Sequence, residues 1–249
     1  MTLQGEPEQV VIAADGVSFA YGKVVALREV SFRLVRGDLA YLVGPSAAGK
    51  TTLLRLIHGL MRPGGGRLVV NGLDVHIATQ TQLRRLRREV GVVFQDYKLL
   101  ERLTAEENVT YALRLADLTL APREAGARAA AALRQVGLGE RLSAYPRELS
   151  GGQQQRLGIA RALASKPVAL LADEPTASLD EANARNVMEL LQHIAGDGTT
   201  VLVATHDTGP VREWGGRMLT LEQGVLKGDR QLRPSLPLRA RSRIAWVGA

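Results

Sequence analysis

The chain contains no cysteine. This absence excludes disulfide bonds and cysteine-ligated metal sites, and it fits a reducing compartment. No apolar run approaches the roughly 20 residues that a membrane-spanning helix requires. The first ten residues, MTLQGEPEQV, lack the basic and apolar regions of a signal peptide. We therefore expect a soluble cytoplasmic chain.

The 249 residues, 45% of them apolar, suffice for one well-buried domain or for a core with a small subdomain. The net charge is +7, and most of it lies at the C-terminal end. The basic residues of this end, opposed by Asp229 alone, are Lys227, Arg230, Arg233, Arg239, Arg241 and Arg243. A basic tail on a nearly neutral body favours a flexible arm over a nucleic-acid-binding face. The tail is either a solubilising end or a segment attracted to an anionic membrane or a partner.

The first 43 residues have the pattern of β-strands. Apolar runs at 10–12, 17–21 and 30–35 alternate with turns and predict an antiparallel layer. The continuous apolar run Leu39–Val43 predicts a strand that is buried on both faces. Helical spacing follows over 50–59.

The middle of the chain, about 108–164, is rich in Ala, Leu and Arg and predicts a helical region. Apolar, β-branched runs return at 168–172 and at Thr200–Thr205, with a helix expected between them over 181–195. Strands that alternate with helices predict an α/β fold with a mainly parallel sheet. The residues after Gly228 are expected to form a loop.

Residues 44–51 read GPSAAGKT and match the pattern G-x-x-x-x-G-K-[ST]. A strand precedes this loop and a helix follows it, so its backbone N–H groups and the positive end of the helix can bind phosphate. Lys50 is suited to bridge the β- and γ-phosphates, and the Thr51 hydroxyl is a ligand for Mg²⁺. The expected nucleotide-binding residues of this segment are Gly44, Pro45, Ser46, Ala47, Ala48, Gly49, Lys50, Thr51 and Thr52.

Two carboxylates follow the buried strand at 168–172. Neighbouring acids on an apolar strand are costly unless a cation compensates them. In a phosphate-loop enzyme Asp173 would hold Mg²⁺ through water, and Glu174 would act as the general base that polarises the attacking water.

Two further polar residues end apolar strands. His206 follows Thr200–Thr205, and after a phosphate loop and a carboxylate strand we expect it to contact the γ-phosphate. Gln95 follows Val92, Val93 and Phe94, where its amide could touch the metal or the water.

The segment 149–153 reads LSGGQ and begins another helix. Ser150, Gly151 and Gly152 thus form a second anion-binding helix end, and one nucleotide does not need two such ends from one chain. The chain thus has one more anion-binding helix end than a single nucleotide needs. In this it resembles the ATP-binding cassette (ABC) ATPases, and the resemblance covers about residues 10–227. The motifs that carry the resemblance are, in order, Tyr21, the loop 44–51 (Walker A), Gln95, the signature 149–153, Asp173 and Glu174 (Walker B), Ser178-Leu179-Asp180, and His206.

The resemblance implies a P-loop ABC cassette at 10–227, with a helical subdomain at about 100–165 and a basic tail at 228–249. It also implies ATP and Mg²⁺ as ligands, with the metal held by Thr51, Gln95 and Asp173. Such cassettes act as head-to-tail dimers, in which the signature of one copy closes over ATP on the other. Tyr21 would stack on adenine, Ser150 to Gln153 would reach the second copy's nucleotide, and Asp180 would lie at the dimer interface.

Within the family, the residues after Gln95 face the membrane partner. Asp96 and Lys98 in the segment FQDYKLL resemble the cell-division cassettes, which bind the inner face of the cell membrane through a polytopic partner. The alternative is the ATPase subunit of a lipoprotein-release or macrolide exporter. The basic run 84–88 is interpreted as a solvated helix face or as a further similarity to the cell-division group. Three features differ from what is usual in the cell-division group: Gln153, Ala47 and the length of the basic tail. Ala47 would be strained if its position requires a positive φ.

Overall fold

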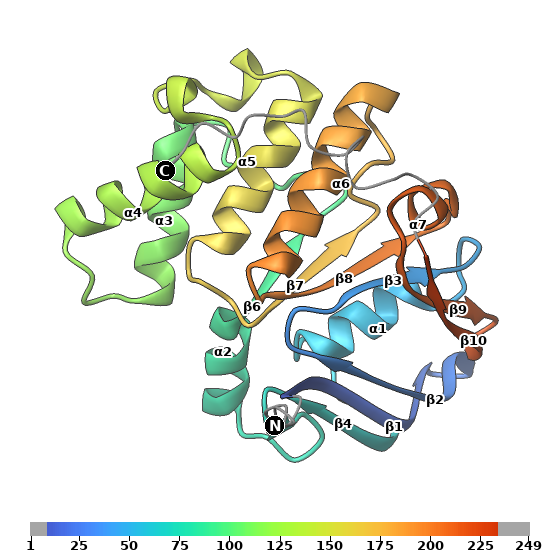
Figure 1. The fold of residues 1–249 in the computed structure, drawn as a ribbon. Helices are drawn as coiled ribbons and strands as arrows, with labels where there is room; N and C mark the ends of the chain where they lie inside the picture. The colour runs from blue at the N-terminus through green and yellow to red at the C-terminus, as the bar shows by residue number, and fades with distance from the viewer. Residues whose placement is uncertain (1–8, 234–249) are drawn as a thin grey trace, which may run out of the picture.

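The computed structural model describes residues 9–233 and contains two sheets with helices around them (Figure 1). The strands are β1 (Val10–Tyr21), β2 (Val24–Val35), β3 (Leu39–Val43), β4 (Gly65–Val70), β5 (Leu73–Asp74), β6 (Val90–Val93), β7 (Ala169–Asp173), β8 (Thr200–Thr205), β9 (Gly216–Glu222) and β10 (Val225–Leu232). The α-helices are α1 (Lys50–Ile57), α2 (Gln80–Glu89), α3 (Ala105–Ala116), α4 (Pro122–Gln135), α5 (Gly151–Leu163), α6 (Glu181–Gly196) and α7 (Gly209–Trp214), with short 3₁₀ turns at Gly139–Arg141 and Pro146–Glu148.

The larger sheet has the strand order β10-β9-β3-β8-β7-β6. All of its neighbouring pairs are parallel except β9 with β10. The register aligns Val43 with Thr205, and Asp173 with Ala204. Strands β3, β8 and β7 therefore end at the same level, and the segments that follow them start side by side. This sheet and its helices confirm the predicted α/β fold with a mainly parallel core.

The predicted antiparallel layer is present, but its strands are longer than expected. Its order is β2-β1-β4-β5. The two runs at 10–12 and 17–21 form one continuous strand, so the predicted break between them is wrong. Gly16 has a φ of 59°, and the pairing of β1 with both neighbours shifts register around it. The glycine therefore makes an irregularity within the strand and does not end it.

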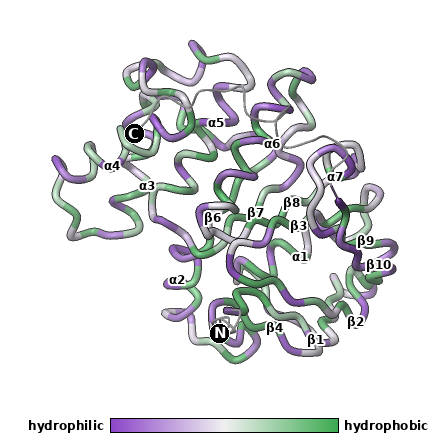
Figure 2. Tube along the Cα trace, in the orientation of Figure 1, coloured by the Kyte–Doolittle hydropathy of each residue, from purple (hydrophilic) through white to green (hydrophobic). Residues whose placement is uncertain are grey.

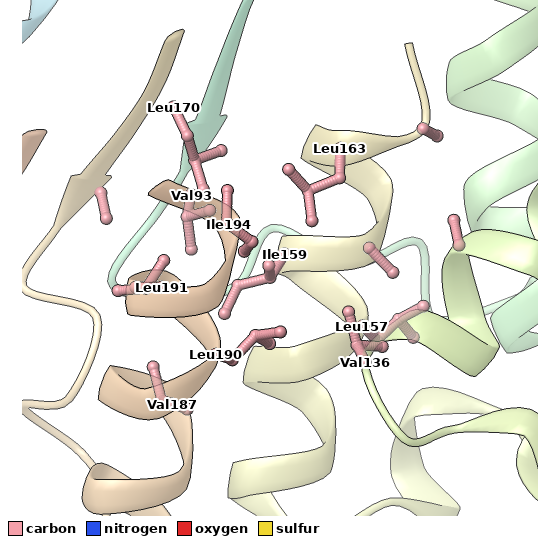
Figure 3. Packing of buried hydrophobic residues seen from close by; sticks show 14 of the residues in the cluster. Val93, Val136, Leu157, Ile159, Leu163, Leu170, Val187, Leu190, Leu191 and Ile194 are labelled. Carbon is pink, nitrogen blue, oxygen red and sulfur yellow. The ribbon is translucent and has the colours of Figure 1, made fainter. Parts of the chain in front are cut away.

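Strand β3 divides the apolar core between two layers, because its successive side chains point to opposite faces of the sheet. Tyr41 and Val43 pack with the cluster that includes α5 and α6, whereas Ala40 and Leu42 pack with the cluster that includes α1 and the antiparallel layer. Apolar residues dominate the central strands in Figure 2. In Figure 3, Ile159 of α5 lies toward Leu190 of α6, whereas Leu157 lies beside Val136.

The middle of the chain is helical, as the composition predicted, with α3, α4 and α5 grouped beside the parallel sheet (Figure 1). The division at about 100–165 stays a prediction. Asn108 is fully buried at the start of α3. Its Oδ1 accepts a hydrogen bond from the N–H of Leu100, and its Nδ2 donates to the carbonyls of Leu100, Leu103 and Thr104. This side chain therefore fixes the segment that leads from Gln95 into the helices.

The expectation of a loop after Gly228 is wrong as far as Leu232. Strand β10 continues to Leu232 and pairs with β9, with one register shift between Leu226 and Gly228. Asp229 accepts hydrogen bonds from Arg217 at 2.8 and 2.6 Å, so this acid of the C-terminal end has a cross-strand partner on β9. The rest of the predicted basic tail, 234–249, lies outside the described residues. No helix within 9–233 has the length and apolar character to cross a membrane.

Candidate functional site

The loop from Gly44 to Gly49 joins β3 to α1, as the sequence predicted. It is packed so tightly that a side chain does not fit at either end. A Cβ on Gly44 would lie 2.0 Å from the carbonyl oxygen of Leu221, and one on Gly49 would lie 2.5 Å from that of Ala26. Gly49 also has a φ of 106° at the N-cap of α1. Both glycines are therefore required by close approach, and the first turn of α1 presents its N–H groups at the sheet edge.

Lys50 is buried at the start of α1, with 7% of its side chain exposed. Its Nζ donates to the carbonyl oxygens of Gly44 and Pro45 at 2.7 and 3.2 Å. The same atom lies 3.6 Å from Oε1 of Glu174. A buried ammonium group with oxygen partners on several sides can exchange some of them for phosphate oxygens without leaving its place.

Thr51 and Asp173 meet across the site: Thr51 Oγ1 donates to Asp173 Oδ2 at 2.8 Å. Burial raises the pKa of the Asp173 carboxyl above its ordinary value, the neighbouring Glu174 adds to this, and the Thr51 bond opposes it. A partly buried carboxylate beside a hydroxyl is a suitable ligand pair for Mg²⁺, which usually takes one or two carboxylates and completes its shell with water and phosphates. Among residues 9–233, no group of three or more His, Asp or Glu side chains could hold a metal without such additional ligands.

Glu174 links the lysine to the histidine. Its carboxylate oxygens each lie 3.0 Å from Nδ1 of His206. Because an ionised carboxylate only accepts hydrogen bonds, Nδ1 is the donor. The Glu174 side chain is 15% exposed and that of His206 is 60% exposed. The Glu174 backbone has a φ of 48°, and its N–H donates to Ala204 at 2.8 Å, so the strand end holds it in an unfavourable conformation.

Tyr21 ends β1 beside the first turn of α1. Its hydroxyl lies 3.5 Å from Thr52 Oγ1 and donates to the sulfur of Met61 at 3.4 Å. Phe19 contacts the ring in an edge-on arrangement, with centroids 4.9 Å apart. The tyrosine is 45% exposed, so ring surface next to the phosphate loop remains open to a ligand.

Gln95 lies at the same sheet edge as the two carboxylates. It is exposed and follows β6, in which Val93 pairs with Ala172, the residue before Asp173. The structure thus brings Gln95 to the end of the strand that neighbours the Asp173 strand, as expected from the sequence.

The signature segment forms the N-terminus of α5 and packs against a different part of the chain. Ser150 is the N-cap: its hydroxyl accepts from the N–H of Gln153 at 3.3 Å, and Gln153 Oε1 accepts from the N–H of Ser150 at 2.9 Å. A Cβ on Gly152 would lie 2.2 Å from Oδ1 of Asn183. Asp180 caps α6 and accepts from both nitrogens of that asparagine, at 2.9 and 2.7 Å. Asn183 thus joins the signature to Asp180.

The predicted site residues therefore form two groups. The first, around Lys50, lies with α1, whose apolar side chains belong to one face of the parallel sheet. The second, around Ser150, belongs to α5 on the opposite face. Sequence reasoning missed Asn183, although an amide three residues after an Asp N-cap is a local signal for such a pair.

Ala47 has a φ of 63°, so its position does require a positive φ and the alanine is strained there. An L-residue with a side chain pays for this left-handed conformation, which glycine adopts freely. Its neighbour Ala48 is buried against the core, with 2% exposed.

Comparisons with known proteins agree with this arrangement. A family model described as "ABC transporter" matches residues 27–177. The chain is 42% identical to the cell division ATP-binding protein FtsE of Escherichia coli K12 over 219 residues, which span 88% of this chain and 98% of that protein. It is 37% identical to the methionine import ATP-binding protein MetN of Brucella abortus over 217 residues, which span 87% of this chain and 58% of MetN.

Solved structures give the same result. The chain is similar to the ATP-binding cassette MJ0796, a dimer in a post-hydrolysis state bound to ADP and Pi, with 33% identity and a TM-score of 0.79 over 90% of this chain and 99% of that one. It is also similar to CbiO1 of Clostridium perfringens, part of the ABC transporter complex CbiONQ, with 26% identity and a TM-score of 0.82 over 90% and 89% of the two chains.

Replacing Ala47 by glycine is expected to stabilise the protein, because glycine has no Cβ to oppose the left-handed conformation. The gain should be about 1 kcal/mol, which corresponds to a rise in Tm of roughly 2–4 °C. Ala48→Gly is the control and should lower Tm, since it removes a buried methyl group. A fall in Tm for both variants would show that Ala47 is not strained.

Asp173→Asn is expected to raise Tm at neutral pH when no divalent cation is present. Because the pKa of Asp173 is raised in the folded state, its stabilising contribution is complete below its unfolded pKa of about 3.9 and is lost as pH rises through the folded pKa. The Tm advantage of Asn should therefore grow as the pH rises above about 4.

The control for this pH series is Asp229, whose contribution to stability is expected to depend on pH in the opposite direction. Hydrogen bonds from Arg217 hold the pKa of Asp229 below its ordinary value. Its contribution is present above the unfolded pKa and is lost as pH falls through the folded one. Asp229→Asn should therefore lower Tm at neutral pH, with a smaller loss in acid. If Asp173→Asn followed this second pattern, the carboxyl would not be destabilised by burial.

Proposed function

This chain belongs to the ABC transporter family of ATP-binding cassettes, and on that basis we propose that it hydrolyses ATP with Mg²⁺ in a head-to-tail dimer and transmits dimer closure to a membrane partner. The observation that carries the proposal is the contact of Glu174 with both Lys50 and His206, at 3.6 and 3.0 Å, next to the Thr51–Asp173 pair. These are the groups that phosphate binding, water activation and metal binding require.

The residues of the loop and of α1 bind the nucleotide. Lys50 exchanges its contacts with the Gly44 and Pro45 carbonyls for the β- and γ-phosphate oxygens, while the N–H groups of the loop surround the β-phosphate. The exposed face of the Tyr21 ring stacks on adenine. Bound Mg²⁺ neutralises phosphate charge, and Thr51, Gln95 and, through water, Asp173 are the residues that would hold it.

Glu174 then activates the attacking water. The water oxygen bonds to the γ-phosphorus, the bond from that phosphorus to the β–γ bridging oxygen breaks, and ADP leaves with those electrons. The proton of the water passes to a carboxylate oxygen of Glu174. His206 holds that carboxylate through Nδ1 and lies where it contacts the γ-phosphate.

The second copy supplies the remaining anion-binding end. Because α1 and α5 lie on opposite faces of the sheet, the Ser150 helix of one chain is not directed at its own phosphate loop. A head-to-tail dimer places Ser150 to Gln153 of one copy over the γ-phosphate bound to the other, with Asp180 at the interface. The dimeric form of the similar cassette MJ0796 supports this proposal.

The partner proposed is FtsX, the polytopic membrane protein that pairs with FtsE in cell division and regulates peptidoglycan hydrolases. The 42% identity to FtsE and the segment around Asp96 and Lys98 favour it. Exposed apolar side chains lie on and beside α3, next to Gln95, and suit a contact with another protein. These side chains, between 36% and 80% exposed, are Phe94, Leu100, Tyr111, Leu115 and Leu118. The chain would thus be peripheral on the inner face of the membrane.

The alternative is the ATPase subunit of a transporter, such as a lipoprotein-release or macrolide exporter. The 37% identity to MetN shows that transport cassettes are also similar to this chain. A transport function would use the same ATP site with a membrane partner that contains a translocation pathway.

Glu174→Gln is expected to lower kcat at least about 100-fold, since it removes the general base. ATP binding should persist, and the dimer should accumulate with ATP bound. Turnover, ATP affinity and size-exclusion chromatography measure these effects. Glu181→Gln is the control, because that side chain is 91% exposed and, among the described residues, pairs with Arg185 alone, at 3.3 Å. Hydrolysis by Glu174→Gln at the wild-type rate would exclude Glu174 as the base.

Leu115→Ser combined with Leu118→Ser is expected to reduce co-purification with co-expressed FtsX at least about tenfold, with ATP affinity unchanged. Ile77→Ser is the matched control, since Ile77 is 76% exposed on the loop before α2. Equal capture of FtsX by the double variant and the control would show that the exposed apolar side chains on and beside α3 are not the docking surface. Failure of the wild-type chain to capture FtsX, with capture of an exporter subunit instead, would favour the alternative function.

A further inference from the structure

The residues directly after Gln95 form a strained turn. Tyr97 and Lys98 have φ values of 56° and 48°, so two consecutive residues with side chains adopt the left-handed conformation. The Tyr97 N–H donates to Phe94 at 3.2 Å, and the Lys98 N–H donates to Asp96 at 2.5 Å. A hydrogen bond that spans two residues around a positive φ is a rare and strained γ-turn. Such a turn persists only when its surroundings hold it.

Arg161, near the end of α5, supplies that support. Its Nη2 donates to the carbonyl of Tyr97 at 2.8 Å, and its Nη1 donates to that of Lys98 at 2.5 Å. The planar guanidinium binds both strained residues at once, which a single-point donor cannot do with the same geometry. Burial lowers the pKa of Arg161, but an arginine stays charged in proteins, so these remain charge-assisted bonds.

The turn also lies along the helix that carries the signature. A Cβ on Gly151 would lie 3.5 Å from the Tyr97 hydroxyl, and one on Gly158 would lie 3.9 Å from the Tyr97 carbonyl oxygen. Tyr97 thus contacts α5 near its first turn as well as near Arg161. The turn after Gln95 and the helix that begins at Ser150 are therefore in contact along most of the helix length.

We propose that Arg161 is a positioning residue for hydrolysis: it clamps the left-handed turn at Tyr97 and Lys98, sets the place of Gln95 at the sheet edge, and makes Gln95 follow the movements of the signature helix. The inference rests on the proposed ATPase function. Without the clamp, two carbonyls lose their charged donors and the turn is free to relax toward ordinary backbone conformations. Gln95, immediately before the turn, then loses its fixed position, whereas the phosphate loop is untouched.

Arg161→Met tests the proposal in the full-length chain, because methionine retains the apolar packing and removes the donors. We expect kcat to fall at least about tenfold, with the ATP dissociation constant within about twofold of wild type. The matched control is Arg156→Met. Arg156 lies on the same helix and is also partly buried, but within residues 9–233 its side chain donates one bond, to Val136 at 3.4 Å. Its kcat should stay within about twofold of wild type.

Two further measurements separate positioning from general destabilisation. Hydrogen exchange at residues 96–99 should accelerate in Arg161→Met and not in Arg156→Met, with or without ATP. Adding Lys98→Gly to Arg161→Met should recover kcat at least about threefold, because glycine adopts the left-handed conformation without a clamp. If Arg161 only stabilised α5, a substitution in the turn would not restore the kcat of Arg161→Met.

The outcomes distinguish this inference from the proposed function. If the wild-type chain binds ATP but neither it nor its dimer hydrolyses it, the ATPase proposal fails, and exchange at 96–99 still tests the clamp. If the wild type hydrolyses ATP while both methionine variants lose the same fraction of kcat and the same exchange protection, the positioning role of Arg161 is overturned. Absence of rescue by glycine, together with a fall in Tm that matches the loss of kcat, also overturns it.

Discussion

The common level at which β3, β8 and β7 end is the constraint on which the candidate site depends. Val43 pairs with Thr205, and Ala204 with Asp173. The pairing continues past the strands, since the N–H of Gly44 donates to Thr205 and that of Glu174 to Ala204. A strand advances about 3.3 Å per residue and its side chains alternate between faces. A slip of one residue would therefore move Glu174 out of reach of Lys50 and turn it to the other face.

The same edge concentrates groups that are unfavourable in a folded chain. Ala47 and Glu174 have positive φ values, and one buried ammonium group opposes the two carboxylates of Asp173 and Glu174. The apolar layers on the two sides of the sheet offset this cost, because strands β3, β7 and β8 are buried almost throughout. The local excess of negative charge suits a cation, and the proposed Mg²⁺ would offset both the carboxylates and the phosphate that Lys50 binds.

The sequence predicted the parts of the molecule that local rules govern. The loop after Val43 and the polar residues that end the apolar strands were found because parallel strands bring their carboxyl ends to one edge. Strand β10 was missed beyond Gly228 because its support, the Arg217–Asp229 pair, comes from the neighbouring strand. The contact of Arg161 with Tyr97 joins residues 64 positions apart, and no periodicity or motif in either segment indicates it. Long-range hydrogen bonds between irregular backbone and a distant helix require the fold itself.

The separation of the two anion-binding helix ends has a mechanical consequence. Since the sheet lies between α1 and α5, the proposed dimer would have ATP on one chain attract the Ser150 helix of another, and its closure would pull on α5 from outside the chain. Within the chain, α5 holds the turn after Gln95 through Arg161, and Asn108 ties the segment beyond that turn to α3. A force on α5 therefore reaches Gln95 and the exposed apolar face of α3 together, by direct contacts. If the proposed dimer and membrane partner are correct, these contacts would link nucleotide state to partner binding through one group of helices.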